Sequence, residues 1–163
     1  MSLRVITGRA KGRILKSVPG DTTRPITDRV KESLFNIIGS DVIDSNWWDV
    51  FGGTGAVGIE ALSRGAAFCR FTDLNRVPIE TIKLNLTATG LASRAEAKRA
   101  DAFSLLASHP DRSFHYVYIA PPQYQEMWSK ALTELDSNRE WLEKDGWVVT
   151  QIHPKEYLSL IHI

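Results

Sequence analysis

The sequence predicts a doubly wound α/β domain with a mostly parallel sheet, preceded by an N-terminal hairpin and helix. Three observations support this fold class. From about residue 46, short apolar runs alternate with longer amphipathic segments, which is typical of parallel βαβ units. A glycine-rich turn follows the first of these runs. The length of 163 residues suits one domain with a substantial core.

The N-terminal segment is expected to form a hairpin from residues 3–7 and 12–17, because apolar and polar residues alternate on both sides of a Gly/Lys turn. A helix follows, with Thr27 or Asp28 as its N-cap and Gly39 at its end. Its apolar face is predicted from residues at helical spacing: Val30, Leu34, Ile37 and Ile38.

The rest of the chain predicts five strands and four helices. The strands are expected at 47–51, 68–73, 95–100, 114–120 and 147–153. The helices are expected at 56–65, 77–90, 101–109 and 126–146. We therefore divide the chain into an N-terminal hairpin and helix, residues 1–40, and an α/β core, residues 41–163.

Composition indicates a cytoplasmic protein. No apolar run approaches the roughly 20 residues that span a bilayer, and the first residues lack the apolar region of a secretory signal. The single cysteine, Cys69, forms no disulfide framework and no CxxC metal site. The four histidines show no metal-ligand spacing with one another or with Cys69, so we predict no metal.

Positive charge is concentrated near the N-terminus. Residues 1–35 contain eight Lys or Arg against three acids, although the whole chain carries a net charge of only +1. Such a basic arm favours a polyanionic partner, although a solvated face without a partner is the alternative. The predicted contacts are Arg9, Lys11, Arg13 and Lys16.

The turn after the first core strand has the spacing of a nucleotide-cofactor motif. Gly53, Gly55 and Gly58 form G-x-G-x-x-G, and Asp73 ends the next strand. The motif alone does not separate NAD from S-adenosylmethionine. Asp49 favours the latter, because a buried carboxylate would bind an ammonium group and repel a pyrophosphate.

Two further features bear on the site. Asp101 and Ala102 begin the loop after the third core strand, where the acid could bind an adenine amino group, cap the next helix, or do both. The fourth strand ends on Pro121-Pro122, a rigid corner that either stops the strand or holds a flat ring.

Several segments together resemble the bacterial small-subunit ribosomal RNA guanine-N2-methyltransferases. They include "RVITGRAKGR", "DTTRPITDRVKESLFNIIG", "DVFGGTGAVGIEALSRGA" and "FTDLNRVPIETIKLNL". The resemblance implies a Rossmann-like fold, S-adenosylmethionine as cofactor, and the N2 atom of one guanine of 16S ribosomal RNA, guanine 966 in the family, as target. It also implies that the basic hairpin binds the RNA, as naked RNA or in a small-subunit particle.

The resemblance further implies roles for individual residues. Asp49, Gly53 and Gly55 would lie along the methionine part of the cofactor, Asp73 at the ribose and Asp101 at the adenine. The remaining predicted cofactor contacts are Phe51, Leu74, Ala102, Arg24 and Thr27.

The diproline corner departs from the family pattern of Asp or Asn, Pro, Pro and an aromatic residue. The first position is Ala120, and the aromatic residue comes one place late, in Gln123-Tyr124. An acceptor at the first position would bind the guanine amino group, and the aromatic ring would stack the flipped base. We expect Gln123 to replace the acceptor within a catalytic set of Ala120, Pro121, Pro122, Gln123 and Tyr124. Slow turnover, an altered target, or binding without catalysis are the alternatives.

The chain ends at "HPKEYLSLIHI", which suffices for one more short strand at most. The family is somewhat longer, so a sheet edge is expected to be uncovered and open to pairing with a second chain. We predict a monomer, with a dimer through that edge as the alternative. A nucleotide-cofactor oxidoreductase and a non-catalytic RNA-binding protein are the rival functions.

Overall fold

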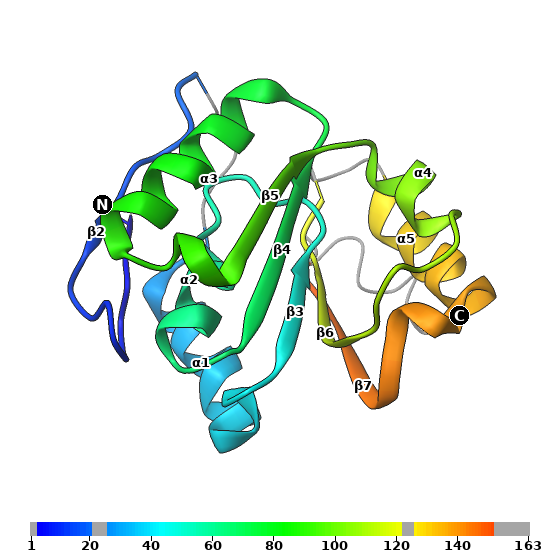
Figure 1. Cartoon of the computed structure of the whole chain (residues 1–163), viewed down its shortest axis with the longest axis horizontal. Helices are drawn as coiled ribbons and strands as arrows, with labels where there is room; N and C mark the ends of the chain where they lie inside the picture. The colour runs from blue at the N-terminus through cyan, green and yellow to red at the C-terminus, as the bar shows by residue number, and fades with distance from the viewer. Residues whose placement is uncertain (1–2, 21–25, 122–125, 152–163) are drawn as a thin grey trace.

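The computed structural model describes residues 3–20, 26–121 and 126–151 (Figure 1). It contains two sheets. The small antiparallel sheet pairs β1 (Leu3–Arg4) with β2 (Ile14–Leu15), which confirms the hairpin with shorter strands than expected. The main sheet is parallel and has the order β5-β4-β3-β6-β7. Its strands are β3 (Asn46–Asp49), β4 (Phe68–Asp73), β5 (Ala95–Arg99), β6 (Phe114–Ile119) and β7 (Leu142–Thr150).

Helices cover both faces of the main sheet. Figure 1 shows α1, α2 and α3 on one side and α4 and α5 on the other. Their bounds are α1 (Asp28–Ile38), α2 (Ala56–Ser63), α3 (Arg76–Thr89), α4 (Ala102–Leu106) and α5 (Met127–Ser137). Short 3₁₀ turns occupy Gly39–Val42, Ala92–Arg94 and Arg139–Trp141. This arrangement confirms the doubly wound α/β class.

Neighbouring residues of each central strand face opposite layers, as the two-residue period of a strand requires. Trp47 packs with α1 and the hairpin in one core cluster, whereas Trp48 packs beside α4 and α5 in the other. Both indoles are fully buried. Their ring partners differ accordingly: Trp47 stacks with Phe35 and Tyr116, and Trp48 contacts Phe114 and Trp141.

The buried face of α1 differs from the predicted one. Thr27 caps the helix and Gly39 ends it, as expected. Ile38 is buried and Leu34 packs against the core, as predicted. However, Lys31 and Phe35 are also buried, whereas Val30 and Ile37 are 47% and 71% exposed. The prediction failed at Lys31 because an ionic partner on another element makes its burial favourable, which an apolar pattern does not reveal.

The last predicted helix was too long. α5 ends at Ser137, and β7 begins at Leu142, inside the segment expected to be helical. The Asn138 side chain donates to the carbonyl oxygens of Leu106 and Ser108, which fixes the chain as it leaves α5. Leu142 then pairs with Phe114, and a register shift precedes the pairing of Tyr116 with Trp147. Tertiary pairing thus overrides the helical pattern of residues 142–146.

The hairpin shares its core with the main sheet. Leu3, Val5 and Leu15 belong to the same buried cluster as α2 and α3. The proposed boundary at residue 40 remains a prediction.

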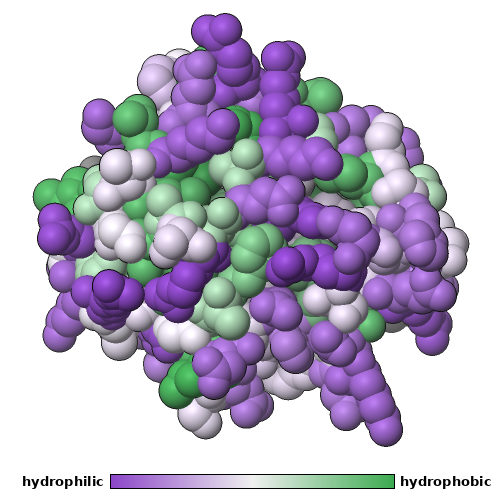
Figure 2. All heavy atoms as spheres, in the orientation of Figure 1, coloured by the Kyte–Doolittle hydropathy of each residue, from purple (hydrophilic) through white to green (hydrophobic). Residues whose placement is uncertain are grey.

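Most of the face in Figure 2 is covered by hydrophilic side chains, with apolar atoms in small areas.

Within the described ranges, no helix is both long and apolar enough to cross a membrane. β7 is the terminal strand of the main sheet among the described residues. The expected short strand after it falls in residues 152–163, outside those residues, so pairing of a second chain at this edge stays a prediction.

Candidate functional site: a cleft at the carboxyl ends of the strands

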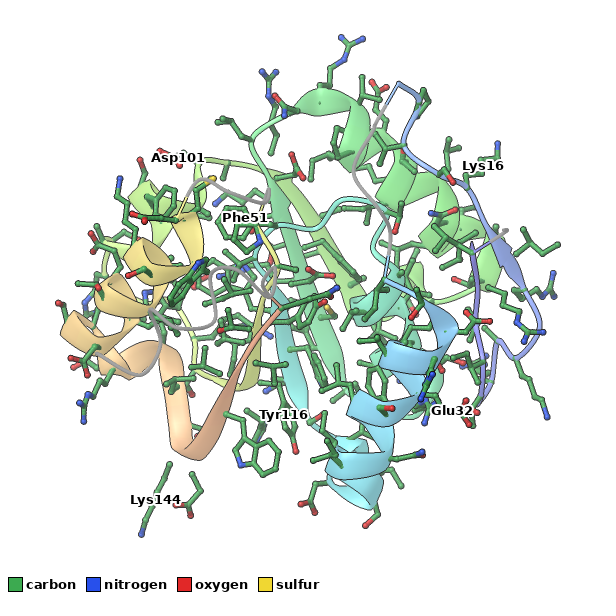
Figure 3. The ribbon with its side chains drawn as sticks, turned by 180° about the vertical axis from the view of Figure 1, so that it is seen from behind. Lys16, Glu32, Phe51, Asp101, Tyr116 and Lys144 are labelled. Atoms are coloured by element: carbon green, nitrogen blue, oxygen red, sulfur yellow. The ribbon has the colours of Figure 1, made fainter. Side chains whose placement is uncertain are left out.

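A cleft of about 720 Å³ opens at the carboxyl ends of β3, β4 and β6. It lies where the strand order reverses, because the chain moves outward from β3 to β5 and then returns to place β6 on the other side of β3. Open α/β sheets bind ligands at this switch point, and the volume suits a small molecule. Figure 3 shows Phe51 and Asp101 at this end of the sheet and Tyr116 toward the other end.

The glycine turn between β3 and α2 forms the floor of the cleft. Gly53 and Gly55 have φ angles of 57° and 81°, which favour glycine. A Cβ on Gly53 would point into open space, whereas one on Gly58 would lie 2.3 Å from the Phe71 ring. Gly53 therefore leaves the backbone open to a ligand, and Gly58 lets α2 pack closely on β4.

Asp49, the last residue of β3, lies beneath this turn. Its side chain is buried, and its Oδ2 accepts one long hydrogen bond, 3.4 Å, from the Gly58 N–H. Its Oδ1 is buried and has no hydrogen-bond partner among the described residues. Burial, with the nearby Asp73 carboxylate adding to it, raises the pKa of Asp49 well above the usual value. Such a carboxylate favours a cation or a group of donors in the cleft.

Asp73 ends β4 and fastens the glycine turn to it. Its Oδ2 accepts from the Gly53 N–H at 3.2 Å, and its Oδ1 accepts from the Asn75 N–H at 3.0 Å. The side chain lines the cleft about one strand away from Asp49. The cleft therefore has acidic groups at two strand ends, which disfavours a pyrophosphate and favours hydroxyl or ammonium groups.

Asp101 caps α4, as the sequence predicted. Its Oδ1 accepts from the Phe103 N–H at 3.2 Å, and its Oδ2 accepts from the Ser104 hydroxyl at 3.0 Å. It also lines the cleft, beside an edge-to-face pair formed by the rings of Phe51 and Phe103, 6.0 Å between centroids. An exposed carboxylate beside apolar rings is a suitable environment for a purine with an amino group.

The end of β6 forms another wall. The Tyr118 hydroxyl donates to Gln151 Oε1, and both residues line the cleft with Ala120 and Pro121. Burial, and to a smaller extent the charge of Asp49, raise the pKa of Tyr118 above its usual value, so its hydroxyl remains a donor at neutral pH. Ala120 contributes no polar side-chain atom to this wall. Pro122, Gln123 and Tyr124 lie outside the described residues.

Seven of the predicted cofactor contacts line the cleft: Asp49, Phe51, Gly53, Asp73, Leu74, Asp101 and Ala102. Gly55 and Thr27 are not among the lining residues. Gly55 turns the chain into α2, and Thr27 accepts from the Val30 N–H to cap α1. Arg24 lies outside the described residues.

Sequence reasoning missed one wall of the cleft. Residues 17–20, which follow the hairpin, line it, as do Pro78, Met127 and Gln151. The Pro19-Gly20 pair indicated a turn, but nothing in the local pattern placed that turn over the first core strand. Only packing of the hairpin on the core brings it there.

The basic side chains of the hairpin are exposed. Arg4 pairs with Asp28 at 2.9 Å. In the described part of the chain, none of Arg9, Lys11, Arg13 and Lys16 forms an ion pair, so all four are available to a polyanion. The same part of the chain contains no cluster of three or more potential metal ligands.

Comparisons with known proteins agree with this geometry. The family model for conserved hypothetical protein 95 matches residues 3–162. YlbH of Bacillus subtilis, whose name provisionally calls it an rRNA methyltransferase, is 43% identical over 94% of this chain and 84% of its own length. Ribosomal RNA small subunit methyltransferase D of Escherichia coli is 32% identical over 91% of this chain and 74% of its own length.

A solved structure of yhhF from Escherichia coli, provisionally named a methyltransferase, superposes with a TM-score of 0.83. It has 33% sequence identity and covers 95% of this chain and 84% of the other. The family model matches nearly all of the chain, and both YlbH and methyltransferase D are more than 30% identical to it. The chain therefore belongs to the family of conserved hypothetical protein 95, which includes ribosomal RNA small subunit methyltransferase D.

Proposed function

We propose that this protein is an S-adenosylmethionine-dependent methyltransferase of small-subunit ribosomal RNA and that it modifies the exocyclic N2 of a guanine. The single observation that carries the proposal is the buried Oδ1 of Asp49, which has no hydrogen-bond partner among the described residues and lies in a cleft at the switch point of a parallel sheet. Family membership supports RNA methylation, since relatives are named for it. The N2 atom and guanine 966 come from the resemblance.

The residues present fit the amino-acid tail and nucleoside of the cofactor. Asp49 would bind the ammonium group, Gly53 would allow close approach of the tail, and Asp73 would bind the ribose hydroxyls. Asp101, with the Phe51 and Phe103 rings beside it, would hold the adenine. When bound, the cofactor supplies an activated methyl group on a sulfonium. Transfer from such a donor mainly needs alignment with the nucleophile, so no metal is proposed.

At the reacting end, this chain must bind the guanine amino group without a side-chain acceptor at residue 120. We propose that a backbone carbonyl at the diproline corner and the Gln123 amide accept its N–H groups, and that Tyr124 stacks the base. Pro121 lines the cleft beside Ala120, which supports this location. Hydrogen bonds accepted from the guanine N–H groups would make the N2 atom a better nucleophile toward the methyl group. The rigid prolines would hold the acceptors in place.

Methyl transfer tests the proposal directly. Radiolabelled S-adenosylmethionine would be incubated with unmodified 16S RNA and with unmodified small-subunit particles, followed by mass analysis of the nucleosides. We expect N2-methylguanosine with wild type and much less of it with Asp49→Asn at a subsaturating cofactor concentration. Methylation of another position would refute the guanine-N2 assignment. Binding of S-adenosylhomocysteine without any transfer would instead favour the non-catalytic RNA-binding protein.

Calorimetry separates the proposed enzyme from an oxidoreductase. S-Adenosylhomocysteine should bind, and NADH should not, because its pyrophosphate would meet the acidic strand ends. Binding of NADH alone would overturn the assignment of the cofactor.

The hairpin is proposed to bind RNA phosphates. Replacing Lys11, Arg13 and Lys16 with glutamine should weaken RNA binding and flatten its salt dependence, by about 0.7–0.9 in the log–log slope for each phosphate that is no longer neutralised. Affinity for S-adenosylhomocysteine should not change. Lys144→Gln is a matched control, because Figure 3 shows Lys144 far from Lys16. An unchanged slope in the triple variant would contradict the role of the hairpin.

A further inference from the structure

Asn85 on α3 connects two segments that the proposed function assigns to different ligands. Its side chain is buried, with 1% exposure, and makes three hydrogen bonds. Oδ1 accepts from the Lys16 N–H at 2.7 Å, and Nδ2 donates to the carbonyl oxygens of Lys16 and Thr54, each at 3.0 Å. The amide thus binds the backbone of Lys16 through both its N–H and its carbonyl, as a neighbouring strand would.

The two segments meet beside the same cleft. Lys16 is an exposed basic residue at the end of the hairpin, and residues 17–20 directly after it line the cleft. Thr54 lies inside the glycine turn and also lines the cleft. We infer that Asn85 is a positioning residue that couples RNA binding at the hairpin to cofactor binding at the glycine turn. This inference rests on the proposed function.

The turn of the hairpin is held separately, by side chains of α2. On α2, Glu60 accepts from the Ile6 and Thr7 N–H groups at 2.9 and 3.1 Å. Ser63 Oγ accepts from the Ala10 N–H at 2.9 Å and donates to the Thr7 carbonyl at 2.7 Å. A Cβ on Gly8 would lie only 2.0 Å from the Ser63 carbonyl oxygen. The hairpin turn therefore packs directly against the helix that begins at the glycine turn.

Asn85 supplies the corresponding attachment at the other end of the hairpin. If its amide were removed, the Lys16 N–H and the two carbonyls would lose their partners in a partly buried position. A ligand that immobilises Thr54 also immobilises Lys16 through this amide, so a second ligand at the hairpin has less ordering left to do. Coupling of this kind is reciprocal and has a positive sign.

A binding cycle tests the inference. The dissociation constant of S-adenosylhomocysteine would be measured with and without saturating unmodified 16S RNA transcript. In wild type, RNA should strengthen the affinity by about tenfold, within the usual range of such couplings. In Asn85→Asp the factor should fall to near one, because the carboxylate keeps the acceptor for Lys16 but has neither donor. Thr81→Val is the matched control, since among the described residues its buried hydroxyl bonds only the Val77 carbonyl of its own helix.

Hydrogen exchange gives a second measurement that does not need the variant to fold. The Lys16 amide donates to Asn85, so S-adenosylhomocysteine alone should slow its exchange in wild type by about tenfold. Unchanged exchange, absence of coupling in wild type, or full coupling in Asn85→Asp would each overturn the inference while leaving the proposed function intact. Failure of wild type to bind either ligand would overturn both.

Discussion

Two buried carboxylates, Glu60 within α2 and Asp49 at the end of the strand before it, have opposite environments. Glu60 accepts from the backbone of Ile6 and Thr7 and pairs with Lys31 and Arg64 at 3.1 and 2.8 Å, so its oxygens are fully used. Asp49, which precedes the helix, has one long hydrogen bond and one oxygen without a partner among the described residues. Both side chains are almost inaccessible to solvent. A satisfied buried acid stabilises the fold, and an unsatisfied one in a cleft indicates a binding site.

The largest expected effect is on stability at Glu60. Glu60→Gln should lower the free energy of unfolding by about 3–5 kcal/mol, because the buried Lys31 ammonium would be left without its charge partner. Urea denaturation would measure it. The double variant Glu60→Gln with Lys31→Met removes both charges and should recover part of that stability. The affinity of folded Glu60→Gln for S-adenosylhomocysteine should change little. A large decrease in that affinity would mean that Glu60, like Asp49, contributes to binding.

The converse is expected at Asp49. Asp49→Asn should weaken S-adenosylhomocysteine binding by about 100-fold, equivalent to about 2.7 kcal/mol, because a neutral amide cannot balance the ammonium group. The unliganded variant should be at least as stable as wild type at pH 7, since no buried charge remains. Calorimetry and urea denaturation on the same samples would check both changes. Retained affinity would remove the basis of the proposed cofactor.

The pH dependence of stability should also distinguish Asp49. Its pKa is raised in the folded state, so between the usual value of 3.8 and the raised pKa the folded protein binds more protons than the unfolded chain. Stability should therefore fall as pH rises through this window, by up to about 1.4 kcal/mol per pH unit. The difference between wild type and Asp49→Asn in urea denaturation series from pH 4 to 8 isolates this contribution. A difference that does not change with pH would contradict a raised pKa of Asp49 in the folded protein.

The smallest effect is expected at an exposed carboxylate. Asp101→Ala should lower the free energy of unfolding by about 1 kcal/mol through removal of the α4 N-cap, and Asp101→Ser should restore most of it. If Asp101 also binds adenine, both variants should weaken S-adenosylhomocysteine binding to a similar extent. Equal affinity in wild type and Asp101→Ser would limit Asp101 to its capping role.

Local patterns predicted much of the site. The sequence was sufficient to predict the spacing of Gly53 from Asp73 and the position of Asp49 at a strand end. Each of these features depends on residues within one βαβ unit. The partners of Lys31 and Asn85 were not readable. Lys31 interrupts the apolar pattern of α1, and its ion pair reaches Glu60 on another element. Asn85 binds Lys16, 69 positions earlier in the chain.

The sequence by itself determined the order of strands and helices, the glycine turn and the acid beneath it. Those features follow from the periods of helix and strand and from the restricted conformations of glycine and proline, all of which act over a few residues. Only the tertiary structure decided which buried polar groups found partners, how residues 17–20 came to line the cleft, and where α5 gave way to β7. These outcomes depend on contacts between distant segments, and a local pattern does not contain such contacts.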